Sequence, residues 1–420
     1  MHIEVMGYIL IPLGIYYLNS NKLLYLTVFF LPFTGMAIIN INNEFGIQPA
    51  HFFLLLLLIQ TLLFNPHSIK LGKVNFKYLF LICFIILLFI LSLADSILSN
   101  GNIQLSNLGQ FVYFGFSFIL FFLVISRVYS EEILEKIIKT YTISIFSTLI
   151  IACIQFIANK LNLFEYPYWI FNNNVSFKQL YNQSLGGFPR LSSSFAEPSM
   201  YAAFLLLVLP IIYYKAYKEI DKTYMDKWLF YLLLVILILT TSTTAFVGLL
   251  IYVSLYCFMI VKNGKLNRKH LISAFIGVSM LPILMRTSLL ESVFVNIIDK
   301  FSGDNLSGSE RWGNFYLGID NFIQNPIFGA GLGSIRTTDA ISNTIGNLGL
   351  FGFAVFIIFF LSILLRKYTA IRKYLSYGVL VYFLISAISN PELTDLNLWL
   401  IFALLSVRYK HTNSEEIRSN

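Results

Sequence analysis

Strongly apolar runs recur along the whole length of this chain of 420 residues, separated by polar breaks. Hydrophobic residues make up 57% of the sequence and charged residues only 12%, whereas a soluble domain carries about 25% charge. Mean hydropathy is +0.74. Within a bilayer each backbone polar group has to be satisfied by the chain itself, and apolar helices do this. The sequence therefore predicts one all-α, polytopic integral membrane domain over residues 1–420.

About 12 to 13 transmembrane helices are expected, since the first two runs are short for a hydrocarbon core of about 30 Å. A short amphipathic helix is expected over residues 127–139. The expected spans cover residues 5–18, 23–39, 50–64, 78–98, 108–126, 141–158, 198–214, 228–239, 245–261, 271–285, 348–365, 374–388 and 396–407.

Two long polar segments, 159–197 and 286–346, interrupt the apolar pattern. When the loops are assigned alternately to the two sides of the membrane, 22 of the 29 Lys and Arg fall on one side. The positive-inside rule makes that side cytoplasmic. Both long loops are then predicted to face outward, and the C-terminus is predicted to be cytoplasmic.

Composition also limits the chemistry that the chain can perform. The basic loops are short and separated by spans, so they do not form a nucleic-acid footprint. The three cysteines lie far apart in apolar runs and are predicted to be core thiols. None of the five histidines lies in either long loop. We therefore expect no metal site and no cofactor.

The end of the first long loop, residues 186–200, is the first candidate site. Arg190 and Ser194 precede Glu197 and Pro198, and an apolar run starts at Tyr201. Proline is favoured in the first helical turn, and helix N-termini attract anions. An Arg beside such a terminus suits a phosphate group. The structural alternative is a snorkelling Arg with an ordinary Ser/Glu cap, and the two interpretations are evenly matched.

The second long loop carries two further candidates. Glu310-Arg311-Trp312 places an aromatic ring beside a cation, a pairing that suits a sugar joined to a phosphate, although interfacial Trp is equally common. Arg336 and Asp339 precede the expected span at 348–365. Asp339 is a candidate base, and a helix-end or solvated loop residue is the favoured alternative. The hydroxyl groups of the turn Thr240–Thr244 could line a cavity near the outer face, but satisfying backbone groups at a tight membrane turn is the favoured interpretation.

These motifs resemble the outer-loop motifs of the O-antigen polymerase/O-antigen ligase superfamily (Wzy/WaaL-like). Arg190 to Pro198, with the sequence RLSSSFAEP, resembles an Arg followed by a Ser-rich, Phe-x-Glu-Pro helix start. Glu310-Arg311-Trp312 followed by Asn325 to Gly333, NPIFGAGLG, is similar to the second family motif. Ser342-Asn343-Thr344 and Gly349 to Gly352 look like its last outer segment. Three motifs in this order on one predicted face are fairly specific.

The resemblance implies a membrane glycosyltransferase of GT-C type that uses neither nucleotide sugar nor metal. The donor would be an oligosaccharide on undecaprenyl diphosphate, in the bilayer at the outer face of the bacterial plasma membrane. Arg190 and Arg311 would bind the diphosphate leaving group, where positive charge stabilises the charge that develops. Arg336, Trp312 and Ser194 are further expected substrate contacts. A chain-length regulator and a flippase would be partners.

The sequence departs from the ligases of this superfamily at one position. Ligases carry a His where this chain has about Ser342, and that His is thought to be the base. The missing His favours a surface-polysaccharide polymerase over a ligase and leaves the base unassigned among Glu197, Glu310 and Asp339, of which Glu197 is preferred. A lipid-linked oligosaccharide flippase is a further alternative, but transporters carry repeats and intramembrane charges. Here Asp95 is the only acidic residue within an expected span. A structural subunit without catalysis is the remaining alternative.

Overall fold

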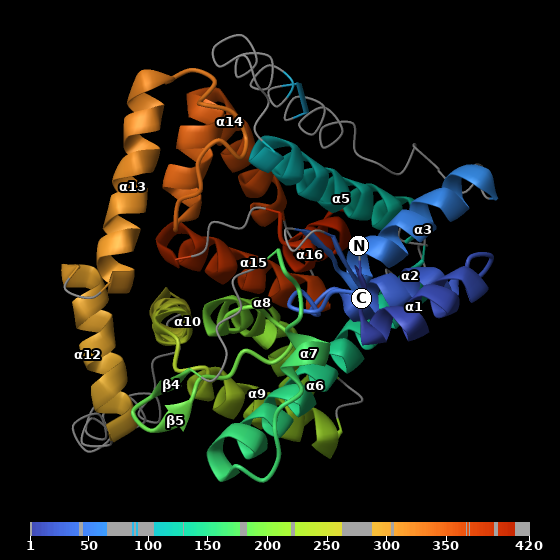
Figure 1. Cartoon of the computed structure of the whole chain (residues 1–420), viewed down its shortest axis with the longest axis horizontal. Coiled ribbons are helices and arrows are strands. Elements are labelled where there is room, and N and C mark those ends of the chain that lie inside the picture. Colours follow the sequence, from blue (N-terminus) through green and yellow to red (C-terminus); the bar gives the residue numbers. More distant parts are fainter. Residues whose placement is uncertain are drawn as a thin grey trace, which may run out of the picture.

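The computed structural model describes residues 2–41, 45–64, 86–87, 90, 105–128, 130–176, 183–219, 223–262, 288–303, 306–366, 368, 370–389 and 394–407. These residues form mainly α-helices, as predicted (Figure 1). The helices are α1 (Val5–Tyr16), α2 (Lys22–Phe30), α3 (Pro49–Leu63), α5 (Leu105–Arg127), α6 (Glu131–Leu161), α7 (Tyr168–Phe171), α8 (Pro198–Tyr217), α9 (Tyr224–Leu239), α10 (Thr243–Lys262), α12 (Ser288–Ser302), α13 (Leu306–Gln324), α14 (Ala340–Leu364), α15 (Ala370–Ser389) and α16 (Leu396–Ser406).

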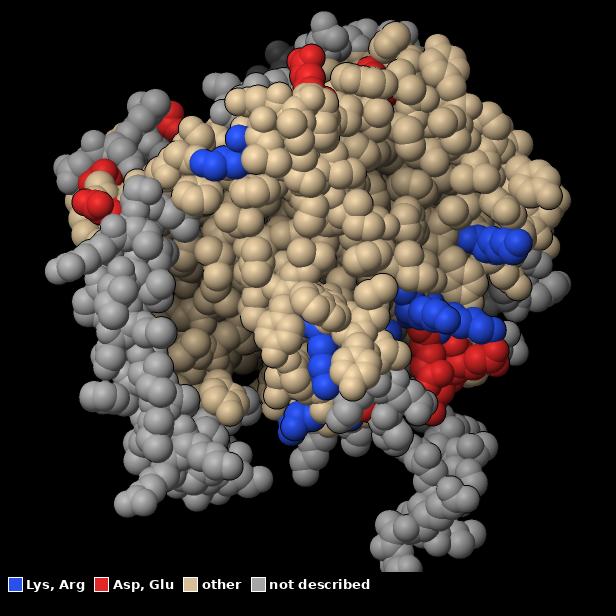
Figure 2. All heavy atoms as spheres, turned by 90° about the horizontal axis from the view of Figure 1, so that it is seen from below, with Lys and Arg blue, Asp and Glu red and all other residues tan. Residues whose placement is uncertain are grey.

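Five of the described helices are long and apolar enough to cross a membrane: α5, α6, α8, α14 and α15. Apolar helices of 10–17 residues include α1, α3 and α16. On the face shown in Figure 2, few charged side chains interrupt the described surface. These features are those of an all-α, multi-pass membrane protein. The number of spans stays a prediction, because the expected spans at 78–98 and 271–285 lie almost entirely outside the described residues.

Three helix boundaries differ from the predicted ones. The expected span over 23–39 is helical only to Phe30, the end of α2, and residues 39–41 form a strand instead. Helix α6 has 31 residues and includes both the mixed-charge segment after Arg127 and the expected span that follows it. It starts after Ser130, whose side chain caps the helix by accepting from Ile133 N at 3.4 Å. The helix expected from 348 begins at Ala340 instead, capped by Asp339. Gly349 interrupts that helix with φ 64° and ψ −169°. The first turns of α14 are therefore polar. Hydropathy alone does not assign them to the helix, because it detects only the apolar run that follows.

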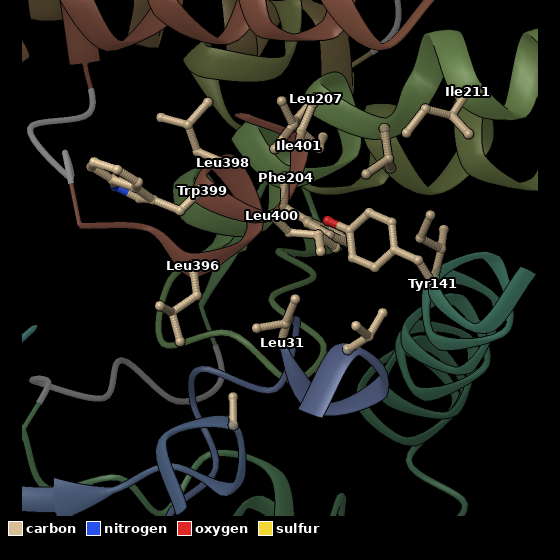
Figure 3. Close-up of a cluster of buried hydrophobic side chains, with 14 of the residues drawn as sticks. Leu31, Tyr141, Phe204, Leu207, Ile211, Leu396, Leu398, Trp399, Leu400 and Ile401 are labelled. Carbon is tan, nitrogen blue, oxygen red and sulfur yellow. The ribbon is translucent and has the colours of Figure 1, made fainter. Parts of the chain in front are cut away.

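The core is centred on α8 and α16 (Figure 3). Every residue of α16 is buried, including Trp399, which packs against Phe359 of α14 with ring centroids 5.7 Å apart. Helix α8 packs closely against α15 at Gly378, where an added Cβ would lie 2.1 Å from the Leu207 carbonyl oxygen. Small residues allow such close helix contacts in membrane proteins.

Two small antiparallel sheets accompany the helices. The strands β1 (His2–Ile3), β2 (Ile39–Ile41) and β3 (Phe45–Ile47) form one sheet in that order. The strands β4 (Ser184–Leu185) and β5 (Phe188–Pro189) form a hairpin. Gly186 and Gly187 make its turn at positive φ, which glycine adopts without a steric penalty. This hairpin delivers the chain directly to Arg190.

Basic side chains bind the helix ends that lie away from this hairpin. Arg127 donates to Gln60 Oε1 at 3.0 Å and to Thr61 Oγ1 at 2.6 Å, which joins the end of α5 to the end of α3. Arg366 and Arg372 donate to carbonyl groups at the end of α16, on Leu405 and Val407. The opposite ends of α3, α5 and α16, with the start of α8, line one cavity, and the starts of α10 and α14 line another.

Candidate functional site

The segment that follows Arg190 is held in place by buried polar groups. Gln155 of α6 accepts hydrogen bonds through Oε1 from Ser192 N at 3.0 Å and Ser193 N at 2.9 Å. Asn172 donates to the carbonyl groups of Ser193 and Phe195 at 3.0 and 2.7 Å. Ser193 has a positive φ of 52°, which is uncommon for a residue with a side chain. This network determines where the arginine and the following glutamate point.

Three charged groups from two parts of the chain come within electrostatic range: Arg190 and Glu197 before α8, and Arg311 on α13. Burial lowers the pKa of Arg190, the charge of Glu197 raises it, and the charge of Arg311 lowers it. Burial likewise lowers the pKa of Arg311, and Glu197 raises it. Arginine remains protonated in proteins. One carboxylate at the start of α8 thus lies within electrostatic range of two partly desolvated cations.

Arg190 also has an unused donor. Its Nε atom is buried and has no hydrogen-bond partner among the residues that the structure describes. Buried donors are usually paired, and an unpaired one calls for an explanation. A guanidinium suits an anion with oxygens arranged for two parallel hydrogen bonds, such as a phosphate. Arg190 and Arg311 therefore form a candidate anion-binding site, and Glu197 is the acidic group near it.

A cavity of about 250 Å³ adjoins this cluster. Arg311 and Trp312 of α13 line it, together with Asp339 at the start of α14. The beginning of α10 contributes Thr243 and Thr244, and the Thr244 and Ser389 hydroxyl groups lie 3.1 Å apart. The N-termini of α10 and α14 both meet at this cavity, and the positive end of a helix favours negative charge. Cation, aromatic ring and hydroxyl groups are thus combined in one space.

The two acidic residues at helix starts differ in what their side chains do. Asp339 caps α14: it accepts from Ser342 N at 2.8 Å, and the Ser342 hydroxyl group donates to its other oxygen. Glu197 occupies the N-cap position of α8 without making a capping bond. Its Oε2 accepts from the Ser199 hydroxyl group at 3.1 Å. Asp339 is therefore committed to the helix, whereas Glu197 makes no capping bond and lies within electrostatic range of the two arginines.

The remaining predicted residues lie elsewhere. Ser194 is fully buried and donates to the Pro32 carbonyl group at 3.0 Å, so it holds the loop. Glu310 is exposed on α13. Arg336 is exposed too and lines a second cavity, away from Arg311. The structure thus brings together Arg190, Glu197, Arg311, Trp312 and Asp339, and separates Ser194 and Arg336 from them.

The glycine-rich segment 325–333 is docked onto α14. Gly331 N donates to the Asn347 carbonyl group at 2.9 Å, and Leu350 N donates to the Pro326 carbonyl group at 2.9 Å. Both the turn and the interrupted helix use glycines at positive φ. This part of the motif shapes the backbone that carries Asp339, and it contributes no side chain to the cavity.

Sequence reasoning ranked two lining residues too low and missed a third. Thr243 and Thr244 line the cavity, the less favoured of the two interpretations of their turn, and Ser389 follows an ordinary apolar run. Their proximity to Arg311 arises from the packing of α10, α13 and α15, which leaves no local sequence signal. Among the described residues, no three His, Cys, Asp or Glu side chains gather as metal ligands would.

The fold defines a multi-pass membrane protein, and its candidate site brings two arginines within electrostatic range of one carboxylate. Residues 228–349 match the family model described as O-antigen ligase (Wzy_C). The match covers just under a third of the chain and contains Arg311, Trp312 and Asp339, but not Arg190. It supports the O-antigen polymerase/ligase superfamily of membrane glycosyl-transferring enzymes and does not separate polymerases from ligases. No curated protein matches the chain.

Proposed function

We propose that this protein is a surface-polysaccharide polymerase. It transfers a growing glycan from undecaprenyl diphosphate to a fresh lipid-linked repeat unit, at the outer face of the bacterial plasma membrane. The observation that supports the proposal is the buried, unpartnered Nε of Arg190 within electrostatic range of Glu197 and of Arg311, which lines the first cavity. Two cations at a helix start are what a departing diphosphate requires.

In the proposed reaction each group of the site has one task. Arg190 and Arg311 hold the diphosphate of the donor, and Trp312 lies against the sugar that is transferred. The anomeric C–O bond to the diphosphate breaks while an acceptor hydroxyl oxygen bonds to the same carbon. Glu197 takes the proton of that hydroxyl group, and undecaprenyl diphosphate leaves with the bonding electrons. Asp339 keeps its capping role, since both of its oxygens already accept hydrogen bonds from Ser342.

The polymerase is preferred to the ligase because of Ser342. Ligases of the superfamily carry a His near this position, whereas Ser342 is fully buried and donates to Asp339. A hydroxyl group held in this way is no base. The ligase remains the second candidate, since the matching family model bears that description. Loss of a polymerase leaves single repeat units on the final acceptor, whereas loss of a ligase leaves none and accumulates lipid-linked polymer.

The proposal includes a placement in the cell. Both arginines come from the segments predicted to face outward, and a basic C-terminal tail is predicted to be cytoplasmic. A flippase would deliver the lipid-linked repeat to the outer leaflet, and a chain-length regulator would limit the product. Oligosaccharide linked to undecaprenyl diphosphate and the bilayer are the direct partners.

The test replaces each arginine separately. A deletion strain complemented with Arg190→Ala or Arg311→Ala is expected to show single repeats and no long chains on a gel of surface glycan, with both variants present in the membrane. Lys22→Ala is the control. It removes an exposed cation that is distant in the sequence from both arginines, and the strain complemented with it is expected to show wild-type chain lengths. Wild-type chain lengths from either arginine variant would contradict the diphosphate-binding role.

A further inference from the structure

We propose that a second cavity, lined by Gln48, His51 and Gln110, binds the sugar of the acceptor glycan. This inference rests on the proposed function and specifies where its second substrate lies. The cavity has a volume of about 150 Å³ and lies between the starts of α3, α5, α8 and α16. That volume has room for several water molecules, which occupy about 30 Å³ each in the liquid, or for one sugar ring in their place.

The strongest evidence is a set of polar side chains that line this cavity without protein partners. Gln48 and His51 are 5% and 6% exposed, and Gln110 lies partly buried beside them. Their side chains make no hydrogen bond to any other residue within the described ranges. Thr34 Oγ1, in the same wall, is buried and likewise unpartnered among the described residues. A buried hydroxyl group such as that of Thr34 is normally satisfied, and several polar side chains lining one cavity are typical of a ligand site, so together they indicate a polar ligand.

The chemistry of the wall selects a sugar over a phosphate. Amide, imidazole and hydroxyl groups both donate and accept, as the hydroxyl groups of a sugar require. The cavity holds one cation, Arg336, and one acidic group, Asp395, among its described lining residues. That balance gives no net attraction for a diphosphate, in contrast to the pair of arginines at the first cavity. The rings of Tyr113 and Phe195 add the apolar faces that lie against sugar C–H groups.

The position of this cavity fits a reaction between two substrates. Phe195 and Met200 line it, and Glu197 lies between them in the chain. The segment from Arg336 to Asp339 also contributes to both cavities, through Arg336 on one side and Thr338 and Asp339 on the other. Helix α15 also lines both cavities, the second through Tyr382 and the first through Ser389. A sugar in the second cavity would therefore lie across a shared wall from the proposed donor site.

The test uses variants that preserve side-chain length and remove only the polar groups. Gln110→Met and Gln48→Met are compared with Gln324→Met, an exposed residue at the end of α13 that lines neither cavity. The Gln48 side chain makes no capping bond to α3, so its replacement leaves the helix start intact. All four proteins, including the wild type, are purified in lipid nanodiscs, and their melting temperatures confirm folding.

The probe is the repeat-unit oligosaccharide released from its lipid, which offers an acceptor hydroxyl group but no diphosphate. We expect calorimetric binding of this oligosaccharide to weaken about threefold to tenfold in Gln110→Met and in Gln48→Met, the loss typical of one or two neutral hydrogen bonds. In transfer assays its KM is expected to rise by the same factor. Inhibition by undecaprenyl diphosphate and the behaviour of Gln324→Met are expected to stay unchanged.

The outcomes separate the two proposals. Oligosaccharide binding equal to wild type in both cavity variants, or an equal weakening of inhibition by undecaprenyl diphosphate, would overturn the acceptor site. A wild-type protein that binds the oligosaccharide through Gln48 and Gln110 but transfers nothing to it would support the sugar site and contradict the polymerase.

Discussion

Gly349 and Gly329 lie backbone against backbone: a Cβ built on Gly349 would be 2.6 Å from the Gly329 nitrogen atom and 2.4 Å from the Ile327 carbonyl oxygen. This contact interrupts α14 and seats the glycine-rich turn against it. Through α14 it also sets the position of Asp339, which lines the first cavity. Two glycines about twenty residues apart in the sequence therefore determine one wall of the candidate site.

Gly349→Ala is expected to destabilise the protein. Its φ of 64° with ψ of −169° belongs to a region that is essentially restricted to glycine, at a cost of about 1–3 kcal/mol for other residues. The clash with Ile327 adds to that cost. Thermal unfolding in detergent should show a melting temperature several degrees lower than wild type. Gly115→Ala on α5 is the matched control, since nothing lies within 4 Å of its added Cβ, and an equal loss there would contradict the explanation.

Gln155→Leu is expected to displace the loop that carries Arg190. The substitution leaves the buried N–H groups of Ser192 and Ser193 without their acceptor, at about 1–3 kcal/mol for each unsatisfied group. Polymer formation should fall more steeply than the amount of folded protein, because the arginine loses its position. Ser192→Ala removes only the 3.3 Å bond from Gln155 Nε2 and should cost less. Full activity in Gln155→Leu would show that the loop does not need this support.

Glu197→Gln tests the proposed base independently of the two arginines. The change removes a charge that competes with the diphosphate for Arg190 and Arg311, so the donor KM should stay level or fall. The rate of transfer should drop by about a hundredfold or more, the usual contribution of a general base. Steady-state kinetics with lipid-linked donor provide the measurement. A kcat close to wild type would assign the base to another group.

Asp395→Asn tests a buried carboxyl group at the start of α16. Burial raises the pKa of Asp395, and hydrogen bonds from Asn397 and Tyr382 oppose that effect. Because the charged form is disfavoured in the folded protein, the stability linked to this group is greatest below about pH 4 and declines as the pH rises through the folded pKa. We expect melting temperatures of variant and wild type to agree near pH 3.5 and the variant to melt higher at pH 7. A difference that does not change with pH would contradict this sign.

Much of the scaffold could be predicted from hydropathy. The expected spans over 50–64, 108–126, 198–214 and 374–388 correspond to α3, α5, α8 and α15 within a few residues. Helices satisfy the backbone polar groups of such apolar runs within a bilayer. The run 23–39 is the exception, since its helix ends at Phe30. Polar first turns were less predictable, since the capping of α14 by Asp339 depends on one side-chain contact.

Most of the site belongs to the tertiary structure. The sequence by itself determined a multi-pass helical protein, and it predicted Arg190 and Arg311 as the cations of the site, because charge and helix-start chemistry are local properties. Only the tertiary structure decided that Arg311 comes within electrostatic range of Glu197, and that Gln48, His51 and Gln110 at the starts of α3 and α5 share a cavity. Such convergence depends on contacts between residues far apart in the chain, which no local pattern encodes.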